Sequence, residues 1–159
     1  MRVGIGWDVH PFKEGKKLIL GGVSIPYKKG LCGWSDADVL LHSVGDALLG
    51  AAGKKDLGSL FPDTQKKFKG ISSLKLLKEI YSLLQKEGFR VNNVDVTLVM
   101  EKPKISPWVE KMKANISSIL KIPPSSVSIK ATTQEGLGFV GREEGVGCLS
   151  VVSIEKNGS

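Results

Sequence analysis

Apolar and polar positions divide this chain into strand-like and helix-like segments. Residues 2–12 alternate apolar side chains with small or polar ones, which predicts an N-terminal strand. Two short apolar runs around Gly21-Gly22 predict a β-hairpin. Three further apolar runs predict later strands, over residues 89–100, 127–132 and 145–154.

Between these strands, apolar residues recur three and four positions apart, the spacing of a helix with one buried face. The first helix is predicted to begin at Ser35, an N-cap followed by acids, and to end before Gly53. Two more are predicted, over residues 72–88 and 107–120. This order predicts an α+β fold, a four-stranded mixed sheet with helices packed on one face plus a short β-hairpin.

Composition is that of a globular protein. The 159 residues predict a single domain, 1–159, and the hydrophobic share of 41% is ordinary. The chain has no apolar run of membrane-spanning length and no signal-peptide pattern. Cys32 and Cys148 are too few for a disulfide framework, so we expect a cytoplasmic protein with reduced thiols.

The formal net charge of +7 does not favour a nucleic-acid partner. Among 23 lysines and arginines, only Arg2, Arg90 and Arg142 are arginines. Nucleic-acid binders usually use arginine as well as lysine. We therefore expect a solvated lysine-rich surface that attracts small anionic substrates, with neither nucleic acid nor a membrane as partner.

One literal motif match is rejected. Residues 136–141 read G-x-G-x-x-G, but a strand follows them where a dinucleotide fingerprint requires a helix and a later acid. We expect these glycines to permit positive φ angles or a close approach to a ligand or second subunit.

Asp8 and His10 indicate a metal site. Residues two apart on a strand share a face, so their side chains converge, although such a pair is more often an ordinary polar contact. The only other histidine, His42, adds a third donor, and three protein ligands with one open position are typical of catalytic zinc. Asp46, one helical turn later, is expected to hold the other nitrogen of the His42 imidazole.

Seven segments resemble one enzyme family in order and spacing. They span residues 2 to about 148 and read GIGWDVHPF, GGVSIPYKKG, SDADVLLHSVGDALLGAAGKKDLGSLFPDT, FKGISSLKLL, NVDVTLV, PK at 103–104 and KATTQEGLGFVGREEGVGC. The chain thus resembles the 2-C-methyl-D-erythritol 2,4-cyclodiphosphate synthases of the non-mevalonate isoprenoid pathway.

The resemblance implies a cyclising phosphorus-oxygen lyase. Its substrate would be 4-diphosphocytidyl-2-C-methyl-D-erythritol 2-phosphate, whose 2-phosphate attacks the β-phosphorus while CMP leaves. The resemblance also implies a homotrimer with active sites between subunits. Each active site would hold one zinc ion, and a magnesium or manganese ion would bridge the α- and β-phosphates.

The resemblance carries the family's site residues onto this chain. Asp8, His10 and His42 match the zinc ligands, Glu135 matches a ligand of the second metal, and Thr133 matches the threonine that contacts the α-phosphate. The other matches are substrate contacts. Those for the methylerythritol and its phosphate are Asp56, Leu57, Gly58, Phe61, Pro62, Asp63 and Thr64. Those for the cytidine are Met100, Pro103, Lys104, Ile105 and Ala131. The remaining residues that match substrate contacts of the family are Asp8, His10, Trp34, Ser35, Thr132, Thr133, Phe139 and Arg142.

Position 34 departs from the family. The family usually has a histidine before the serine, and the resemblance implies that a histidine there stabilises the transition state through a phosphate contact. Here Trp34 precedes Ser35. The indole offers one N–H donor and no cationic form, so Trp34 either donates one hydrogen bond or only packs.

The residues leave three other functions open. A zinc phosphohydrolase would use Asp8, His10 and His42 to activate water, and its products would be linear. A non-catalytic trimer would bind phosphate-bearing ligands or isoprenoids without releasing CMP. A basic nucleic-acid module would bind with a steep salt dependence.

Overall fold

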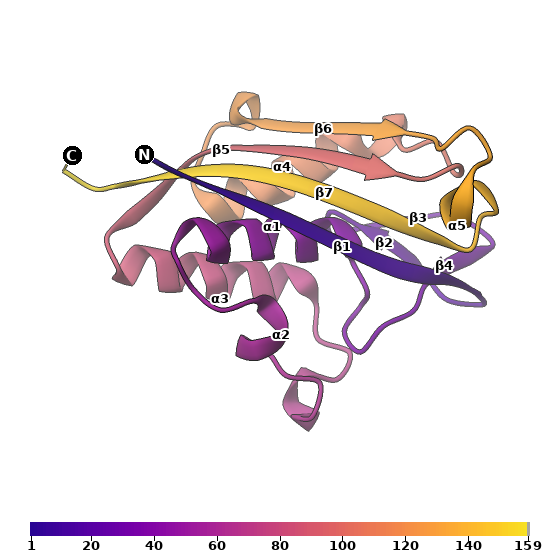
Figure 1. Ribbon diagram of the computed structural model, residues 1–159, viewed down its shortest axis with the longest axis horizontal. Coiled ribbons are helices and arrows are strands. Elements are labelled where there is room, and N and C mark those ends of the chain that lie inside the picture. The colour runs from indigo at the N-terminus through magenta and orange to yellow at the C-terminus, as the bar shows by residue number, and fades with distance from the viewer. Residues whose placement is uncertain (159) are drawn as a thin grey trace.

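A five-stranded mixed sheet with helices on one side dominates the computed structural model, which describes residues 1–158 (Figure 1). The sheet order is β4-β1-β7-β5-β6, and only β5 and β6 run parallel. The strands are β1 (Arg2–Glu14), β4 (Lys29–Leu31), β5 (Phe89–Val99), β6 (Val127–Thr132) and β7 (Gly145–Lys156). The predicted hairpin is confirmed as β2 (Leu18–Leu20) and β3 (Val23–Ile25).

The α+β class is confirmed, but the predicted four strands are wrong. The fifth strand, β4, is a three-residue segment that is not among the predicted strands, and it pairs with the end of β1 through Phe12 and Leu31. An ideal Cβ at Gly30 would lie 2.2 Å from the carbonyl oxygen of Lys17, so a glycine is required for this close approach. Such a short, glycine-containing strand has too few residues to show a period-2 pattern.

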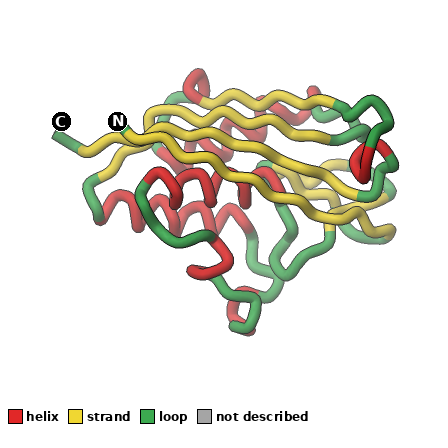
Figure 2. Tube along the Cα trace, viewed as in Figure 1, coloured by secondary structure: helices red, strands yellow, loops and turns green. Residues whose placement is uncertain are grey.

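The three long helices lie on one side of the sheet (Figures 1 and 2). The long ones are α1 (Val39–Ala51), α3 (Ser73–Lys86) and α4 (Val109–Leu120); the single-turn ones are α2 (Leu57–Leu60) and α5 (Gly138–Gly141). Three 3-10 turns complete the set, Lys66–Phe68, Ser106–Trp108 and Pro124–Ser126. Within residues 1–158 no helix combines the length and apolar character needed to cross a bilayer.

The N-cap of helix α1 lies three residues later than predicted. Ser35 is not its N-cap; Asp38 is, and its carboxylate accepts a hydrogen bond from the Leu41 N–H at 3.1 Å. The same buried carboxylate accepts the N–H groups of Gly21 at 3.0 Å and Gly22 at 2.7 Å. Burial raises the pKa of Asp38 to about 6, although these hydrogen bonds act to lower it. One side chain thereby ties the start of α1 to the hairpin turn.

Helix α1 lies directly on the backbone of β1. An ideal Cβ at Gly4 would lie 1.9 Å from the Ala47 carbonyl oxygen, and one at Gly6 would lie 1.9 Å from that of Ser43. Any side chain there would separate the helix from the strand. This contact sets the distance between Asp8 and His10 on the strand and His42 on the helix.

The other face of β1 and β7 is apolar and exposed. Ile5 is 67% exposed and Trp7 52% exposed. Their cross-strand partners, Val151 and Leu149, are exposed on the same face. An apolar sheet face that is exposed to solvent in the single chain is typical of a site that binds another protein surface.

Candidate active site

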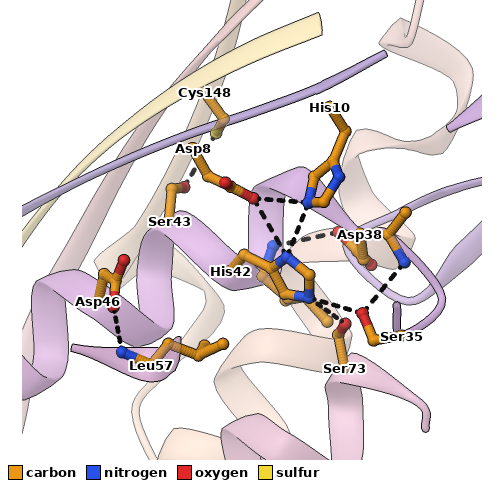
Figure 3. Close-up of polar contacts among 12 residues, drawn as sticks. Asp8, His10, Ser35, Asp38, His42, Ser43, Asp46, Leu57, Ser73 and Cys148 are labelled. Carbon is orange, nitrogen blue, oxygen red and sulfur yellow. Dashed lines mark hydrogen bonds and ion pairs between the residues drawn. The ribbon is translucent and has the colours of Figure 1, made fainter. Parts of the chain in front are cut away.

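Three side chains converge where β1 passes α1 (Figure 3). Asp8 Oδ2 lies 3.0 Å from His10 Nε2 and 3.1 Å from His42 Nδ1. The two imidazole nitrogens are 3.1 Å apart. Zinc bonds of about 2.0–2.1 Å at tetrahedral angles separate ligand atoms by roughly 3.3–3.4 Å. The three atoms are therefore close to the positions of three zinc ligands.

Hydrogen bonds outside the cluster fix which nitrogen of each imidazole can bind a metal. His10 Nδ1 lies 3.0 Å from the Cys32 carbonyl oxygen, which only accepts, so His10 donates there and keeps a lone pair on Nε2. His42 Nε2 lies 3.0 Å from both Ser35 Oγ and Ser73 Oγ, which leaves Nδ1 facing the cluster. Two imidazole nitrogens and a carboxylate oxygen suit a divalent metal such as zinc.

The expected role of Asp46 is wrong. Its carboxylate accepts the Leu57 N–H at 2.7 Å and so holds α2 against α1. The hydroxyls of Ser35 and Ser73 occupy the His42 nitrogen predicted for it (Figure 3).

The cluster favours a positive charge at its centre. Burial opposes ionisation of Asp8, but hydrogen bonds and charge from His10 and His42 outweigh it and lower the pKa of Asp8 to about 2. Burial alone would lower the pKa of His10, but the hydrogen bond and charge of Asp8 raise it above the ordinary 6.5. A divalent cation would supply the same charge in place of protons.

A cavity of about 270 Å³ opens beside His10 and His42. Its walls contain six other residues predicted as substrate contacts: Trp34, Ser35, Leu57, Gly58, Phe61 and Asp63. Phe68, Ile71 and Leu76 add an apolar wall that the sequence did not indicate. Phe68 is buried although lysines surround it in the sequence, because its ring packs edge-on against Phe61.

A second cavity, of about 380 Å³, lies at the ends of β5 and β6. All five residues predicted for the cytidine line it, together with Thr132 and Thr133. The Thr133 hydroxyl lies 3.4 Å from a carboxylate oxygen of Glu135, whose φ is 54°. The two cavities share no lining residue within one chain.

The remaining predicted residues lie outside both linings. The Asp56 carboxylate caps α2 by accepting the Ser59 N–H at 2.7 Å. Pro62 and Thr64 belong to the loop beyond Phe61. Phe139 lies in α5, and Arg142 directly follows it and pairs with Glu144 at 2.9 Å.

Sequence reasoning missed the surroundings of the metal cluster. In the sequence, Ser73 is only a residue at the start of the predicted helix 72–88, and Asp36 is only one of the acids that follow Ser35. The signal that could have found them is the polar pair Ser35-Asp36 just before the helix that carries His42. The fold brings this pair to the start of α3, where Asp36 accepts the Ser73 N–H at 2.9 Å.

Comparison with known proteins now gives the family. Residues 1–155 match the YgbB family. The chain belongs to this family. A relative from Clostridium acetobutylicum, named 2-C-methyl-D-erythritol 2,4-cyclodiphosphate synthase, is 56% identical over 95% of this chain and 97% of its own length. A protein of the same name from Chlorobium phaeovibrioides is 58% identical over 98% of this chain and 99% of its own.

Solved structures of similar proteins have the same fold as this chain. The Plasmodium falciparum IspF complex with CDP has a TM-score of 0.86 at 34% identity, over 98% of this chain and 96% of that one. The bifunctional IspDF of Campylobacter jejuni has a TM-score of 0.94 at 43% identity. It is a longer chain, and 98% of this chain covers 42% of it.

Proposed function

We propose that this YgbB-family chain is a 2-C-methyl-D-erythritol 2,4-cyclodiphosphate synthase of isoprenoid precursor biosynthesis. It would convert 4-diphosphocytidyl-2-C-methyl-D-erythritol 2-phosphate to the cyclic diphosphate and CMP. The observation that carries the proposal is the convergence of Asp8, His10 and His42 beside a cavity. That cluster lies in a chain 56% identical to a protein of this name.

The reaction needs no protein nucleophile. An oxygen of the 2-phosphate forms a bond to the β-phosphorus, and the bond from the β-phosphorus to the oxygen shared with the α-phosphate breaks. The electron pair leaves with CMP. Because nucleophile and leaving group belong to one molecule, the chain's main task is to hold both in line, which can save on the order of 7–11 kcal/mol.

The donor set of Asp8, His10 and His42 fits zinc, one ion per active site. When bound, zinc would neutralise charge on the phosphate oxygens. We also propose that Glu135, beside Thr133, holds a magnesium or manganese ion on the diphosphate, because hard cations prefer oxygen ligands.

The two cavities would bind the two ends of the substrate. The cavity beside His42 would take the methylerythritol phosphate, with Asp56, Pro62 and Thr64 at its edge. The cavity at Pro103 would take the cytidine. Thr133 would contact the α-phosphate, and the Trp34 indole N–H would donate to a phosphate oxygen.

We propose a homotrimer whose active sites lie between subunits, with the metal cavity of one subunit completed by the cytidine cavity of a neighbour. Two features support this. The cavities share no lining residue, and the exposed apolar face around Ile5 and Trp7 would be covered by assembly. Phe139 and Arg142 would then lie near the trimer's central cavity and the substrate.

The chemistry implies a location and a ligand class. Two free cysteines fit a reducing compartment, so we place the enzyme in the cytoplasm, acting on a small molecule.

The test is CMP release from the cytidylated substrate. The protein with zinc and magnesium should release CMP, a chelator should stop it, and added metal should restore it. His42→Ala should abolish release. Ser82→Ala, which changes an exposed serine on α3, is the matched control and should leave it unchanged. Wild-type protein that releases no CMP with both metals present would refute the proposal.

A further inference from the structure

We propose that Ser73 and Asp36 position His42 for metal binding by fixing which of its two nitrogens carries the proton. The inference rests on the proposed metal role of His42. Ser73 is the first residue of α3 and is 1% exposed, and Asp36 lies in the segment before α1. Ser73 contacts the imidazole at Nε2, the nitrogen that does not face the metal cluster, and Asp36 acts through Ser73.

The proton count decides the tautomer. The Ser73 hydroxyl has one hydrogen, and it donates a short hydrogen bond to an Asp36 carboxylate oxygen, which can only accept. Ser73 Oγ therefore offers only a lone pair to His42 Nε2, 3.0 Å away. For this contact to be a hydrogen bond, the proton must sit on Nε2, and Nδ1 keeps the lone pair that faces Asp8 and His10.

Ser35 cannot enforce this choice. Its oxygen accepts the Ala37 N–H at 3.2 Å, but its own hydrogen is uncommitted among residues 1–158, apart from the 3.0 Å contact with His42 Nε2. Ser35 can therefore donate to Nε2 or accept from it. Ser73 differs because its only hydroxyl hydrogen is donated to Asp36, so Ser73 can only accept a hydrogen bond from His42 Nε2.

Without Ser73, the other tautomer becomes favourable in the metal-free protein. A proton on His42 Nδ1 would point at Asp8 Oδ2, 3.1 Å away, and at His10 Nε2. That proton would have to leave before a metal could bind. Ser73 and Asp36 thus favour cation binding, because they keep the proton on Nε2 and leave Nδ1 of His42 free to bind the cation.

The backbone fixes this pair in place. Asp36 also accepts the Ser73 N–H at 2.9 Å and the Asp38 N–H at 3.2 Å, so its carboxylate joins the start of α3 to the segment that leads into α1. The orientation of His42 is therefore set from two helices at once.

The test is zinc affinity of the whole protein, measured by competition with a chromophoric chelator. Ser73→Ala should weaken zinc binding by about 10–100-fold. Asp36→Asn should weaken it less, because the amide oxygen still accepts the hydroxyl. Ser35→Ala should change it by less than about threefold, and so should the exposed control Ser82→Ala on the same helix.

Two further readouts separate positioning from a merely structural role. Nitrogen NMR of the metal-free protein, above the ordinary imidazole pKa, should show His42 protonated on Nε2 in the wild type and shifted toward Nδ1 in Ser73→Ala. Melting temperatures of metal-free Ser73→Ala and Ser82→Ala should differ far less than their zinc affinities.

Unchanged zinc affinity in Ser73→Ala would overturn the inference, as would equal losses in Ser35→Ala and Ser73→Ala. A wild-type tautomer with the proton on Nδ1 would also overturn it. Each of these outcomes leaves CMP release by the wild type unaffected, so failure of the inference is distinct from failure of the proposed function.

Discussion

Gly6→Ala tests whether the contact between β1 and α1 sets the metal geometry. The new Cβ would lie 1.9 Å from the Ser43 carbonyl oxygen, whereas ordinary contacts begin at 3.4 Å. The helix must therefore retreat by about 1.5 Å, the difference between the two. His42 immediately precedes Ser43 and moves with it, and this shift is several times the roughly 0.2 Å tolerance of metal–ligand distances.

Two losses follow for Gly6→Ala. Overpacking against backbone should cost about 3 kcal/mol, which for a chain of this size lowers the melting temperature by roughly 6–12 °C. Zinc affinity should fall by more than about tenfold, because His42 no longer meets Asp8 and His10. Thermal unfolding of the metal-free protein and chelator competition measure the two effects at equal chain concentration.

Gly50→Ala is the matched control. Gly50 lies on α1, the helix that Gly6 contacts, but it is exposed. An ideal Cβ at Gly50 would meet only the Ile5 carbonyl oxygen, at 4.0 Å. It should stabilise the protein slightly, by up to about 1 kcal/mol, and leave zinc affinity unchanged. Wild-type stability and zinc affinity in Gly6→Ala would refute the reasoning.

The remaining predictions concern pH, position 34 and assembly. Zinc competes with a proton on His10, whose pKa lies above 6.5, so affinity measured by chelator competition should fall by about tenfold per pH unit below that raised pKa; a flat profile would contradict this. In the metal-free protein the same raised pKa gives stability that is complete below pH 6.5 and is lost as pH rises through the raised value, which urea titration should show. Trp34→His should raise CMP release, by at most roughly 10²–10³-fold, because it adds a donor that can carry charge; an unchanged rate would mean that the donor is filled or unnecessary. Ile5→Glu should dissociate the proposed trimer in analytical ultracentrifugation, since Ile5 is 67% exposed in one chain; an intact trimer would exclude this face as the interface.

Local patterns were sufficient where one residue's neighbours decide its position. Asp8 and His10 meet because residues two apart on a strand share a face. His42 was found because the chain has only two histidines. Strands β5 and β6 were predicted almost to the residue, because in each a run of β-branched and apolar residues is bounded by turn residues.

Local patterns failed where a tertiary contact decides. Asp46 follows His42 by one turn, but helical side chains lean toward the N-terminus, so the His42 ring reaches back toward Ser35 and Ser73. Both Ser35 and Asp38 are good N-caps by type, and the N–H groups of the hairpin turn favour Asp38. Those donors lie sixteen and seventeen residues away, outside any helix pattern.

The apolar residues of β1 show a related failure. Their alternation would normally mark a core face, yet the buried face is formed by Gly4 and Gly6, and the apolar residues point outward. The helix approaches closely because the glycines have no side chains. Apolar residues on the opposite face are then available for assembly, which a single chain cannot show.

Phosphorus NMR of the complete reaction tests the central claim most directly. With wild-type protein, zinc and magnesium, the cytidylated substrate should give the two coupled resonances of a cyclic diphosphate together with one equivalent of CMP. Linear phosphate products, or CMP without the cyclic diphosphate, would mean that Asp8, His10 and His42 serve hydrolysis rather than cyclisation and would contradict the account.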